Sequence, residues 1–346
     1  MSSRRVGKPS PELLNDLLRD SNGKPSHRVL VGPGAGLDAA IIDMGHGEIM
    51  AVAEDPIFPA PGLPLEIMGR FTVHIGASDV AVTGVKPEFM TYTLLLPGSS
   101  PESDARLLIR SISQTARELG ITIVGGHTGW YDAVNIPIVG GVTVWGTAPR
   151  DQWVSPGSSK KGDFLLMTKG PAIEAAALLA VIYKDKIKDR IGPELMDRLL
   201  ARVDQITVVE DALTAFAVGG VHAMHDATEG GVLCGLWEMS AAAGLSVHVD
   251  LDRIVVPEEI RKLAEILQFD PWCAISEGTL LIAVEPGSLN RVEAALAEIG
   301  IESFLLGRFV DGSEDSTLRR GGKTTAMPEP GVDPFWDLFF AGLAPG

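Results

Sequence analysis

The sequence predicts a two-domain fold of mixed α and β structure, and three observations lead to this prediction. The chain has 346 residues, more than the roughly 100–200 residues of one typical domain. Short β-rich runs alternate with longer helical segments, a pattern typical of α/β and α+β proteins. This pattern stops at a connector rich in Pro, Ser and Gly, residues 149–162, and then starts again. We therefore expect residues 1–150 and 151–346 to form separate domains.

The N-terminal half begins with an amphipathic helix that the pair Ser10-Pro11 caps. Gly120 is placed to end a later helix, and Gly140-Gly141 predicts a β-bulge within a long strand. The remaining elements expected here are strands at 39–43, 49–53, 88–96, 121–124 and 135–147, and helices at 65–82 and 101–119.

The C-terminal half repeats the alternation of strands and helices. The expected strands are 163–168, 246–249, 279–284, 303–310 and 315–320, and the expected helices are 172–183, 207–218, 232–243, 257–268 and 288–299. The aromatic segment 335–340 (FWDLFF) is expected to dock against its own domain or a dimer mate. Trp130-Tyr131 is compatible with either a substrate lid or an exposed loop.

Composition excludes several classes of protein. The formal charge is −16, which disfavours binding to nucleic acid or to an anionic membrane, since both require basic surfaces. Hydrophobic residues make up 45% of the chain, too many for a disordered protein. Cys234 and Cys273 are too few for a disulfide framework and form no metal-type pair. No apolar run reaches the ~20 residues that span a bilayer, and no secretory signal is present, so we expect a cytoplasmic protein.

Chemistry is expected in the N-terminal half, where flexible backbone repeatedly stands beside a carboxylate or an imidazole. Such segments occur at 32–38, 52–56, 76–79 and 125–128. Glycine lets the main chain approach a phosphate, and carboxylates can hold Mg²⁺, which bridges to phosphate oxygens. Between Arg28 and Arg106 the only basic residues are Arg70 and Lys86. A nucleotide bound here would therefore need metal ions to neutralise its charge, and neither a Walker nor a Rossmann motif is present.

Each candidate also has a purely structural interpretation. The segment 32–36 could be a plain loop, and Asp38 or Asp55 could be a turn residue or a helix cap. His127 could be a hydrogen-bonded structural histidine. Asp79 is harder to explain in this way, because it lies in the apolar helical stretch 75–82 and a buried carboxylate needs a partner.

Six segments of the chain form a recognisable series of motifs: GLDAA (36–40), EDP (54–56), SDVAVTGVKP (78–87), GGHT (125–128), MHDATEGGV (224–232) and ISEGTLLIAV (275–284). Taken together, they resemble the aminoimidazole ribonucleotide (AIR) synthase-related superfamily over about residues 32–312. Within it, EDPIFPAPG (54–62) and DPWCAISEG (270–278) are similar to hydrogenase-maturation proteins of the HypE type.

The resemblance implies an N-terminal domain that contributes to a dimeric β-barrel and a C-terminal α/β domain that closes over ATP. It implies Mg²⁺ ligands at Asp38, Asp55, Asp79 and Asp226. It also implies catalytic roles for Glu277, whose other interpretation is a structural carboxylate, and for His127. The implied nucleotide-binding residues are Gly32, Gly34, Gly36, Asp38, Ser78, Gly125, Gly126, Thr128 and Thr228.

Three departures from the family patterns bear on the reaction. Leu37 replaces an aspartate of the GDDAA segment, GGHT replaces the GGDT of HypE, and the sequence printed here ends in FFAGLAPG without the terminal cysteine of HypE. GGHT is the form found in selenophosphate synthetases, but no cysteine precedes Cys234. We expect a homodimeric enzyme that transfers a phosphoryl group from ATP to an amide-type or other small-molecule oxygen, on a free or protein-borne acceptor. The alternatives are a non-catalytic ATP-binding maturation or regulatory homodimer, a kinase of the thiamine-monophosphate or selenophosphate type, and a dimer that has lost nucleotide binding.

Overall fold

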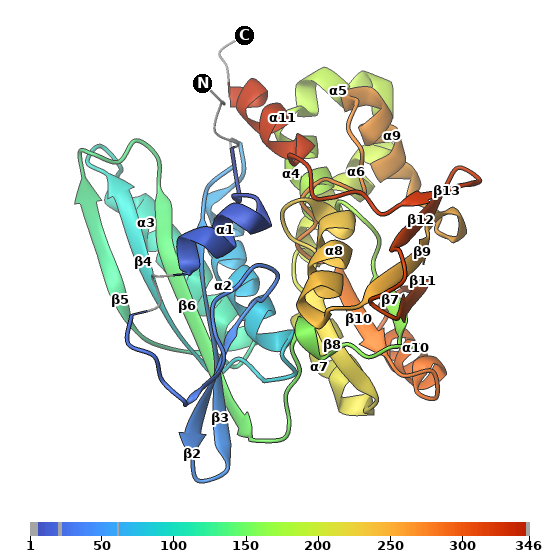
Figure 1. Ribbon diagram of the computed structural model, residues 1–346. Helices are drawn as coiled ribbons and strands as arrows, with labels where there is room; N and C mark the ends of the chain where they lie inside the picture. The colour runs from blue at the N-terminus through green and yellow to red at the C-terminus, as the bar shows by residue number, and fades with distance from the viewer. Residues whose placement is uncertain (1–5, 20–22, 61, 344–346) are drawn as a thin grey trace.

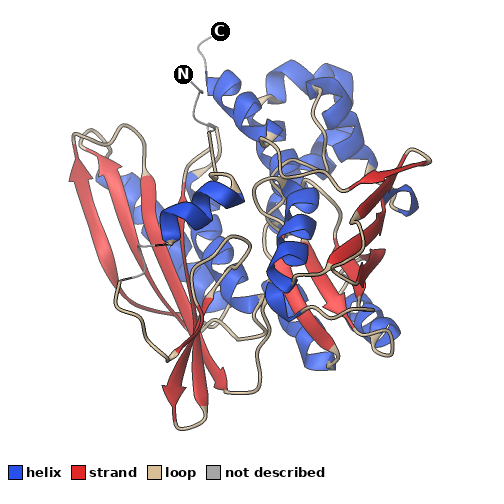
Figure 2. Cartoon of the chain, viewed as in Figure 1, coloured by secondary structure: helices blue, strands red, loops and turns tan. Residues whose placement is uncertain are grey.

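The computed structural model describes residues 6–19, 23–60 and 62–343. The elements form two lobes, each built on one mixed β-sheet (Figure 1). In both lobes helices pack on the strands (Figure 2). The predicted mixed α/β fold is therefore confirmed. Among the helices in these ranges, none combines the length and the apolar character needed to cross a membrane.

The first lobe contains a six-stranded sheet in the order β1-β2-β3-β6-β4-β5. All neighbouring strands are antiparallel except β4 and β5, which are parallel. Its strands are β1 (Val29–Val31), β2 (Ala40–Gly45), β3 (Glu48–Ile57), β4 (Phe89–Pro97), β5 (Thr122–Tyr131) and β6 (Ile138–Pro149), and its helices are α1 (Pro11–Leu18), α2 (Leu65–Ala81) and α3 (Glu102–Glu118).

Helix α2 connects the sheet of the first lobe to the second lobe. It packs against β3, β6 and α3 on one side and against α7 and β8 on the other. Small residues permit this close packing: a Cβ added at Gly69 would lie 2.6 Å from the Cβ of Ser111 in α3, and one at Gly76 would lie 3.0 Å from Val144. A helix packed on both sides presents one of its polar residues, Asp79, towards the second lobe.

Strand β5 differs from its prediction. We expected a strand ending at residue 124 and a glycine-rich loop after it, but the strand continues to Tyr131. Parallel pairing with β4 supplies the main-chain hydrogen bonds, and a register shift after Ile123 leaves Val124 out of the ladder. The predicted bulge at Gly140 is confirmed, because Thr93 pairs with Gly141 and the next residue of β4 pairs with Val139.

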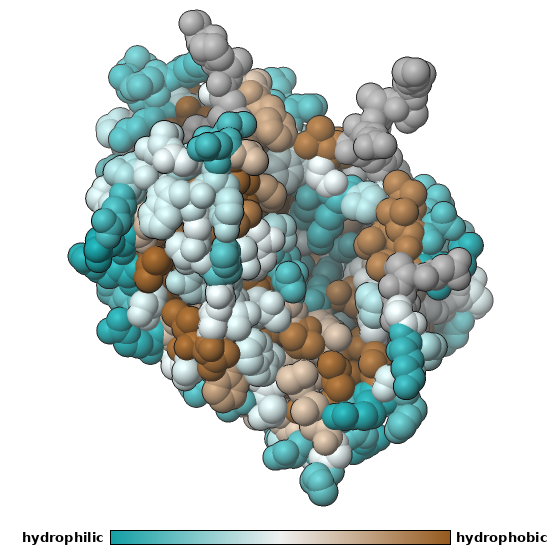
Figure 3. Space-filling model, turned by 90° about the vertical axis from the view of Figure 1, so that its left-hand side faces the viewer, coloured by the Kyte–Doolittle hydropathy of each residue, from teal (hydrophilic) through white to brown (hydrophobic). Residues whose placement is uncertain are grey.

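The outer face of this sheet carries exposed apolar side chains. Phe89 stacks on Trp145 with ring centroids 5.9 Å apart, and the edge strand β5 exposes Val124, Trp130 and Tyr131. Figure 3 views the molecule from this side and shows brown apolar groups scattered between pale and teal ones. An exposed edge strand beside apolar surface is a typical place for another chain to bind.

The second lobe contains a seven-stranded sheet in the order β13-β12-β9-β11-β7-β10-β8. Only β12 and β9 are parallel. Its strands are β7 (Phe164–Thr168), β8 (Val221–Asp226), β9 (Ser246–Asp250), β10 (Leu280–Val284), β11 (Ser303–Val310), β12 (Thr317–Arg320) and β13 (Lys323–Ala326). Its helices are α4 (Ile173–Ile182), α5 (Lys184–Ile191), α6 (Pro193–Ala201), α7 (Val209–Val218), α8 (Gly231–Ala243), α9 (Glu258–Leu267), α10 (Leu289–Glu298) and α11 (Pro334–Leu343).

Helix α11 explains the aromatic segment near the end of the chain. Phe335 and Phe339 are buried, and the helix packs against α4 of the same chain. The Tyr183 hydroxyl donates a hydrogen bond of 2.7 Å to the main-chain oxygen of Leu338. The segment therefore docks on its own domain, which was one of the two expectations.

Candidate functional site

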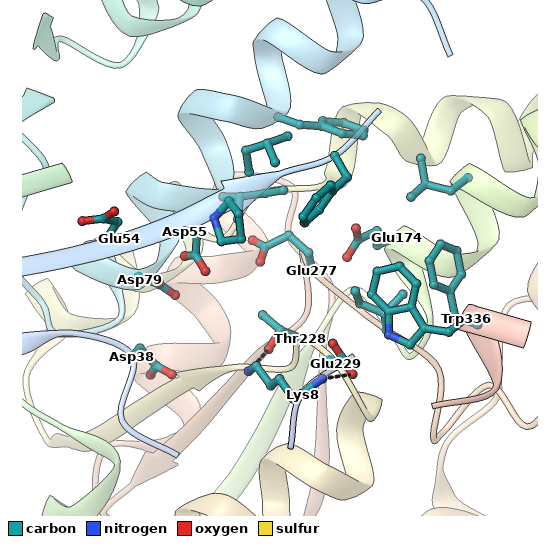
Figure 4. Close-up of a pocket in the computed structure, with 18 of the residues that line it drawn as sticks. Lys8, Asp38, Glu54, Asp55, Asp79, Glu174, Thr228, Glu229, Glu277 and Trp336 are labelled. Carbon is teal, nitrogen blue, oxygen red and sulfur yellow. Dashed lines mark hydrogen bonds between the residues drawn. The ribbon is translucent and has the colours of Figure 1, made fainter. Parts of the chain in front are cut away.

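A cavity of about 450 Å³ is lined by residues of both lobes. Figure 4 shows its acidic side chains, with Asp38, Asp55 and Asp79 on one side and Glu174 and Trp336 on the other. The residues that line it are Lys8, Leu14, Gly34, Gly36, Leu37, Asp38, Glu54, Asp55, Pro56, Ile57, Phe58, Ala60, Leu63, Phe71, Ile75, Asp79, Glu174, Leu178, His225, Thr228, Glu229, Glu238, Ile275, Glu277, Phe335, Trp336 and Phe339.

Local structure explains why two of the predicted aspartates meet. Alternation along β3 places Asp55 on the same face as the buried Ala51 and Ala53, which is the face that α2 covers. Asp79 lies on α2, so the two carboxyl groups approach each other. The pairing register of β3 with β6 shifts after Asp55, next to Pro56, and thus bends the strand at this point.

The glycine-rich segment brings Asp38 to the second lobe. Gly36 has φ +73°, and an added Cβ there would lie 2.7 Å from the Cβ of Glu238 on α8. Only glycine permits this approach without a shift of the helix. Asp38 then lies beside His225 and Asp226 at the end of β8, where one ligand atom from each of the three residues lies within 4.8 Å of the others.

The pKa values of the carboxyl groups show how crowded this cluster is. Burial raises the pKa of Asp79 well above its ordinary value, and the neighbouring Asp55, Asp226 and Asp38 raise it further. Burial and the Asp38 carboxylate raise the pKa of Asp226 to about 6, against the opposing effect of the imidazolium of His225. A divalent cation would relieve this repulsion.

The donor set fits Mg²⁺. Both side-chain oxygens of Asp226 and Oδ2 of Asp38 are buried without a hydrogen-bond partner among the described residues. Carboxylate oxygens are the ligands that Mg²⁺ takes in proteins. Buried carboxylates without partners are costly unless a cation compensates them, so these aspartates have the chemistry of a magnesium site.

His225 is a site residue that the sequence reasoning missed. Its Nδ1 lies 2.7 Å from Oδ1 of Asp38, and its Nε2 lies 3.0 Å from Oε2 of Glu238. Burial lowers the pKa of this imidazole, but the two carboxylates outweigh burial and raise it well above its ordinary value. These two contacts favour the protonated imidazole, which has no free lone pair for a metal, and they place His225 between Asp38 and Glu238. Its position beside Asp226 in MHDATEGG was the signal that could have found it.

Glu277 and Glu174 lie where the acidic part of the cavity meets its apolar wall. Glu277 is 1% exposed, and neither of its carboxyl oxygens has a hydrogen-bond partner among the described residues. Burial and the neighbouring Asp226 and Glu174 raise its pKa well above the ordinary value. Burial raises the pKa of Glu174 to about 8. Both groups therefore hold a proton more readily than an exposed glutamate does, as buried acid–base groups in active sites do.

The structure separates the predicted site residues into two groups. Gly34, Gly36 and Thr228 line the cavity together with Asp38, Asp55, Asp79 and Glu277. Ser78 is fully buried, and its hydroxyl accepts a hydrogen bond of 3.2 Å from the main-chain N–H of Val208, which ties α2 to the second lobe. The predicted residues that do not line the cavity are Gly32, Ser78, Gly125, Gly126, His127, Thr128 and Asp226. Asp226 lies next to two residues that do, Asp38 and His225.

His127 lies on the exposed edge strand β5. Its Nε2 is 2.6 Å from the Tyr131 hydroxyl, and the two rings stack with centroids 6.1 Å apart. Gly125, Gly126 and Thr128 are exposed on the same strand. Within one chain these four residues of β5 therefore do not line the acidic cavity.

Neither cysteine is suited to nucleophilic chemistry. Both are free, and neither lines the cavity. Burial raises the pKa of Cys234 above its ordinary value, and burial with the nearby Asp270 raises that of Cys273 to about 12. Because the thiolate is the reactive form, both side chains are packing residues.

Two family models match the chain on either side of the connector. The N-terminal domain of AIR synthase related proteins matches residues 36–148, and their C-terminal domain matches residues 160–318. The chain belongs to the AIR synthase related family. The carboxylate cluster is built from both matched regions, since Asp38, Asp55 and Asp79 come from the first and Asp226 and Glu277 from the second.

Curated relatives in this family differ in their named activities. The chain is 24% identical over 306 residues to a putative hydrogenase expression/formation protein of Methanocaldococcus jannaschii, covering 86% of this chain and 87% of that protein. It is 28% identical over 266 residues to the carbamoyl dehydratase HypE of Escherichia coli, covering 74% and 73%. It is 30% identical over 337 residues to a selenide, water dikinase of E. coli, covering 88% and 91%.

Solved structures of the family share the fold. The crystal structure of E. coli HypE has a TM-score of 0.71 at 24% identity and covers 93% of this chain and 98% of that one. A HypE structure in complex with ATP has a TM-score of 0.67 at 18% identity and covers 96% and 98%. The two-lobed architecture is thus that of AIR synthase related proteins along nearly the whole chain.

Proposed function

We propose that this chain is a cytoplasmic, ATP- and Mg²⁺-dependent enzyme that transfers a phosphoryl group to an amide-type or other small-molecule oxygen, on a free or protein-borne acceptor. The observation that supports the proposal is a cluster of buried carboxyl oxygens on Asp38, Asp226 and Glu277 that have no hydrogen-bond partner in the described part of the chain, at a cavity that residues of both lobes line. The names of the relatives support it, because a carbamoyl dehydratase, a selenide, water dikinase and an ATP-bound HypE are among them.

Asp38, Asp55, Asp79 and Asp226 are the proposed Mg²⁺ ligands. Bound Mg²⁺ would neutralise the triphosphate, which the acidic cavity would otherwise repel. Gly34 and Gly36 would offer main-chain surface to the phosphates, and Thr228 lines the same cavity. The chain thereby positions the nucleotide mainly through oxygen ligands and main-chain groups.

Glu277 is the proposed acid–base residue at the acceptor. It is buried beside the carboxylate cluster and close to the apolar wall, and burial raises its pKa above the ordinary value, so its carboxylate binds a proton more strongly than an exposed glutamate does. An acceptor bound against this wall would therefore lie between Glu277, which can take its proton, and the phosphate of the proposed Mg-ATP.

We further propose that the enzyme is a homodimer formed through the outer face and edge of the first sheet. Apolar side chains gather there, including the exposed Phe89 and the half-buried Trp145 on which it stacks, and β5 is the edge strand of the described sheet. In this assembly five predicted residues that lie outside the cavity of their own chain would contribute to a nucleotide site formed together with the second chain. They are Gly32, Gly125, Gly126, His127 and Thr128. Light scattering of the wild type and of Phe89→Asp tests it: a dimer that the substitution dissociates supports the proposal, and a wild-type monomer refutes it.

Calorimetric titration of ATP, with Mg²⁺ and with EDTA, tests the nucleotide site. We expect binding that requires Mg²⁺. ADP release is then measured with a carbamoylated peptide, thiamine monophosphate and selenide as candidate acceptors. ADP release stimulated by one of them supports the enzyme, whereas the absence of Mg-ATP binding refutes the proposal.

A non-catalytic ATP-binding homodimer is the second candidate. The observation that favours it is the place of His127 on β5, outside the cavity of its own chain. Under this alternative, Mg-ATP binds with measurable heat while ADP release stays at background with every acceptor. The same titration and turnover assay therefore separate the two functions.

A further inference from the structure

The charges that line the cavity are strongly unbalanced. Eight of the lining residues carry a carboxyl group, and Lys8 is the one lysine or arginine among the described residues that line it. The eight are Asp38, Glu54, Asp55, Asp79, Glu174, Glu229, Glu238 and Glu277. A single ammonium group among so many carboxyl groups has a large electrostatic effect on whatever binds beside it.

The main chain around Lys8 follows a defined path. Its N–H donates a hydrogen bond of 2.6 Å to Oε1 of Glu229. Gly7 has φ +92°, and a Cβ there would collide with the Glu229 carboxylate and lie 2.6 Å from Nε1 of Trp336. On the other side, Ser10 caps α1 by accepting a hydrogen bond of 3.3 Å from the N–H of Leu13. We name residues 7–10 the N-terminal arm; it is held at both ends, between the second lobe and α1.

The Lys8 ammonium reaches from the arm into the cavity. It donates a hydrogen bond of 3.0 Å to the Thr228 hydroxyl, and Figure 4 shows it pointing from the side of Glu229 towards Asp38 and Asp79. An ammonium has three N–H donors, and Thr228 is its one side-chain partner among the residues described. Two of its N–H donors are therefore without a side-chain partner among the described residues, in a cavity that Asp38, Asp79 and Glu277 also line.

We propose that Lys8 is a catalytic residue that contacts the transferred phosphoryl group of Mg-ATP. This inference rests on the proposed function. In the proposed site the aspartates would reach the phosphates only through metal, and among the described lining residues Lys8 is the lysine or arginine that can donate hydrogen bonds directly to the phosphate oxygens. Such a donor acts most strongly where charge develops during transfer.

The reaction balances without further reagents. The acceptor oxygen forms a bond to the terminal phosphorus while the bond from that phosphorus to the bridging oxygen breaks, and ADP leaves with the electron pair. A proton on the acceptor passes to the Glu277 carboxylate. Lys8 keeps its protons throughout and donates hydrogen bonds to the phosphoryl oxygens.

The test compares Lys8→Met and Lys8→Arg with a control, Lys24→Met, which changes an exposed lysine outside the cavity. Calorimetry measures the affinity for Mg-ATP and for Mg-ADP-fluoroaluminate, which mimics the group in transfer and needs no identified acceptor. We expect Lys8→Met to weaken the mimic about 100-fold and Mg-ATP less than about tenfold. Lys8→Arg should recover part of the loss, and Lys24→Met should match the wild type.

The outcomes separate this inference from the proposed function. If wild-type protein binds neither ligand, the proposed function fails and the role of Lys8 fails with it. If the wild type binds both and Lys8→Met weakens them equally or not at all, the nucleotide site stands and the catalytic role of Lys8 is refuted. Thermal unfolding of each variant shows whether the fold is intact, and a Lys8→Arg variant as weak as Lys8→Met would also count against the proposal.

Discussion

Glu174→Gln should make the metal-free protein more stable at neutral and alkaline pH. Glu174 is only 8% exposed, and burial raises its pKa from 4.5 to about 8, although a backbone hydrogen bond with Glu277 opposes part of this effect. An acid with a raised pKa binds its proton more tightly in the folded state. The folded state is therefore most stable, as far as Glu174 is concerned, below pH 4.5, where the group is protonated in both states. This contribution is lost as the pH rises towards 8.

The size of the effect follows from the two pKa values. At pH 7 the group is ionised in the unfolded chain and still mostly protonated in the folded one, which costs about 3 kcal/mol of stability at 1.36 kcal/mol per pH unit. Above pH 8 the cost approaches about 5 kcal/mol. Glutamine has nearly the same shape and never ionises, so the substitution should recover up to these amounts.

Urea unfolding in EDTA at pH 4, 7 and 9 measures this gain. Glu298→Gln, at an exposed position on α10, is the matched control and should change stability little at any pH. The difference between Glu174→Gln and the wild type should grow with pH and vanish near pH 4. A gain that does not depend on pH, or a loss of stability at pH 9, would refute the argument that burial holds this carboxyl group neutral.

Three further predictions concern the site and its support. Asp79→Asn should weaken Mg-ATP binding about 100-fold, about 2.7 kcal/mol, with little change in the unfolding midpoint because a crowded charge is removed. Calorimetry checks it, with Asp315→Asn at an exposed position outside the cavity as the control, and undiminished ATP affinity would contradict it. His225→Gln should lower the free energy of unfolding by about 3 kcal/mol, because the buried carboxylates of Asp38 and Glu238 lose the imidazolium that lies between them. Urea unfolding measures the change, and an unchanged denaturation midpoint would show that these two contacts do not stabilise the fold. Phe335→Ala should lower the free energy of unfolding by about 3–5 kcal/mol, since Phe335 is only 2% exposed. Phe340→Ala, at a side chain that is 48% exposed, is the control and should lower it far less. Equal losses in urea unfolding would mean that Phe335 does not anchor α11.

Local patterns made most of the fold predictable. Helix α2 was expected at 65–82 and is found at Leu65–Ala81, and the strand expected at 303–310 is β11. Periodicity, caps and glycine positions act between residues close in sequence, so they can be read without the fold. Strand β8 was missed because its last residues, His225 and Asp226, are polar although buried. These polar residues interrupt the apolar pattern that marks a buried strand.

By itself the sequence determined which segments carry acidic and glycine-rich chemistry and that any polyphosphate here would need metal ions, because charge and residue type are properties of the chain. Only the tertiary structure decided which of these groups meet. Packing of α2 between the lobes brings Asp79 to Asp226, while strand pairing with β4 carries His127 away to an exposed edge. Lys8 and Glu174 enter the site from distant positions that no local pattern connects, because proximity depends on long-range packing.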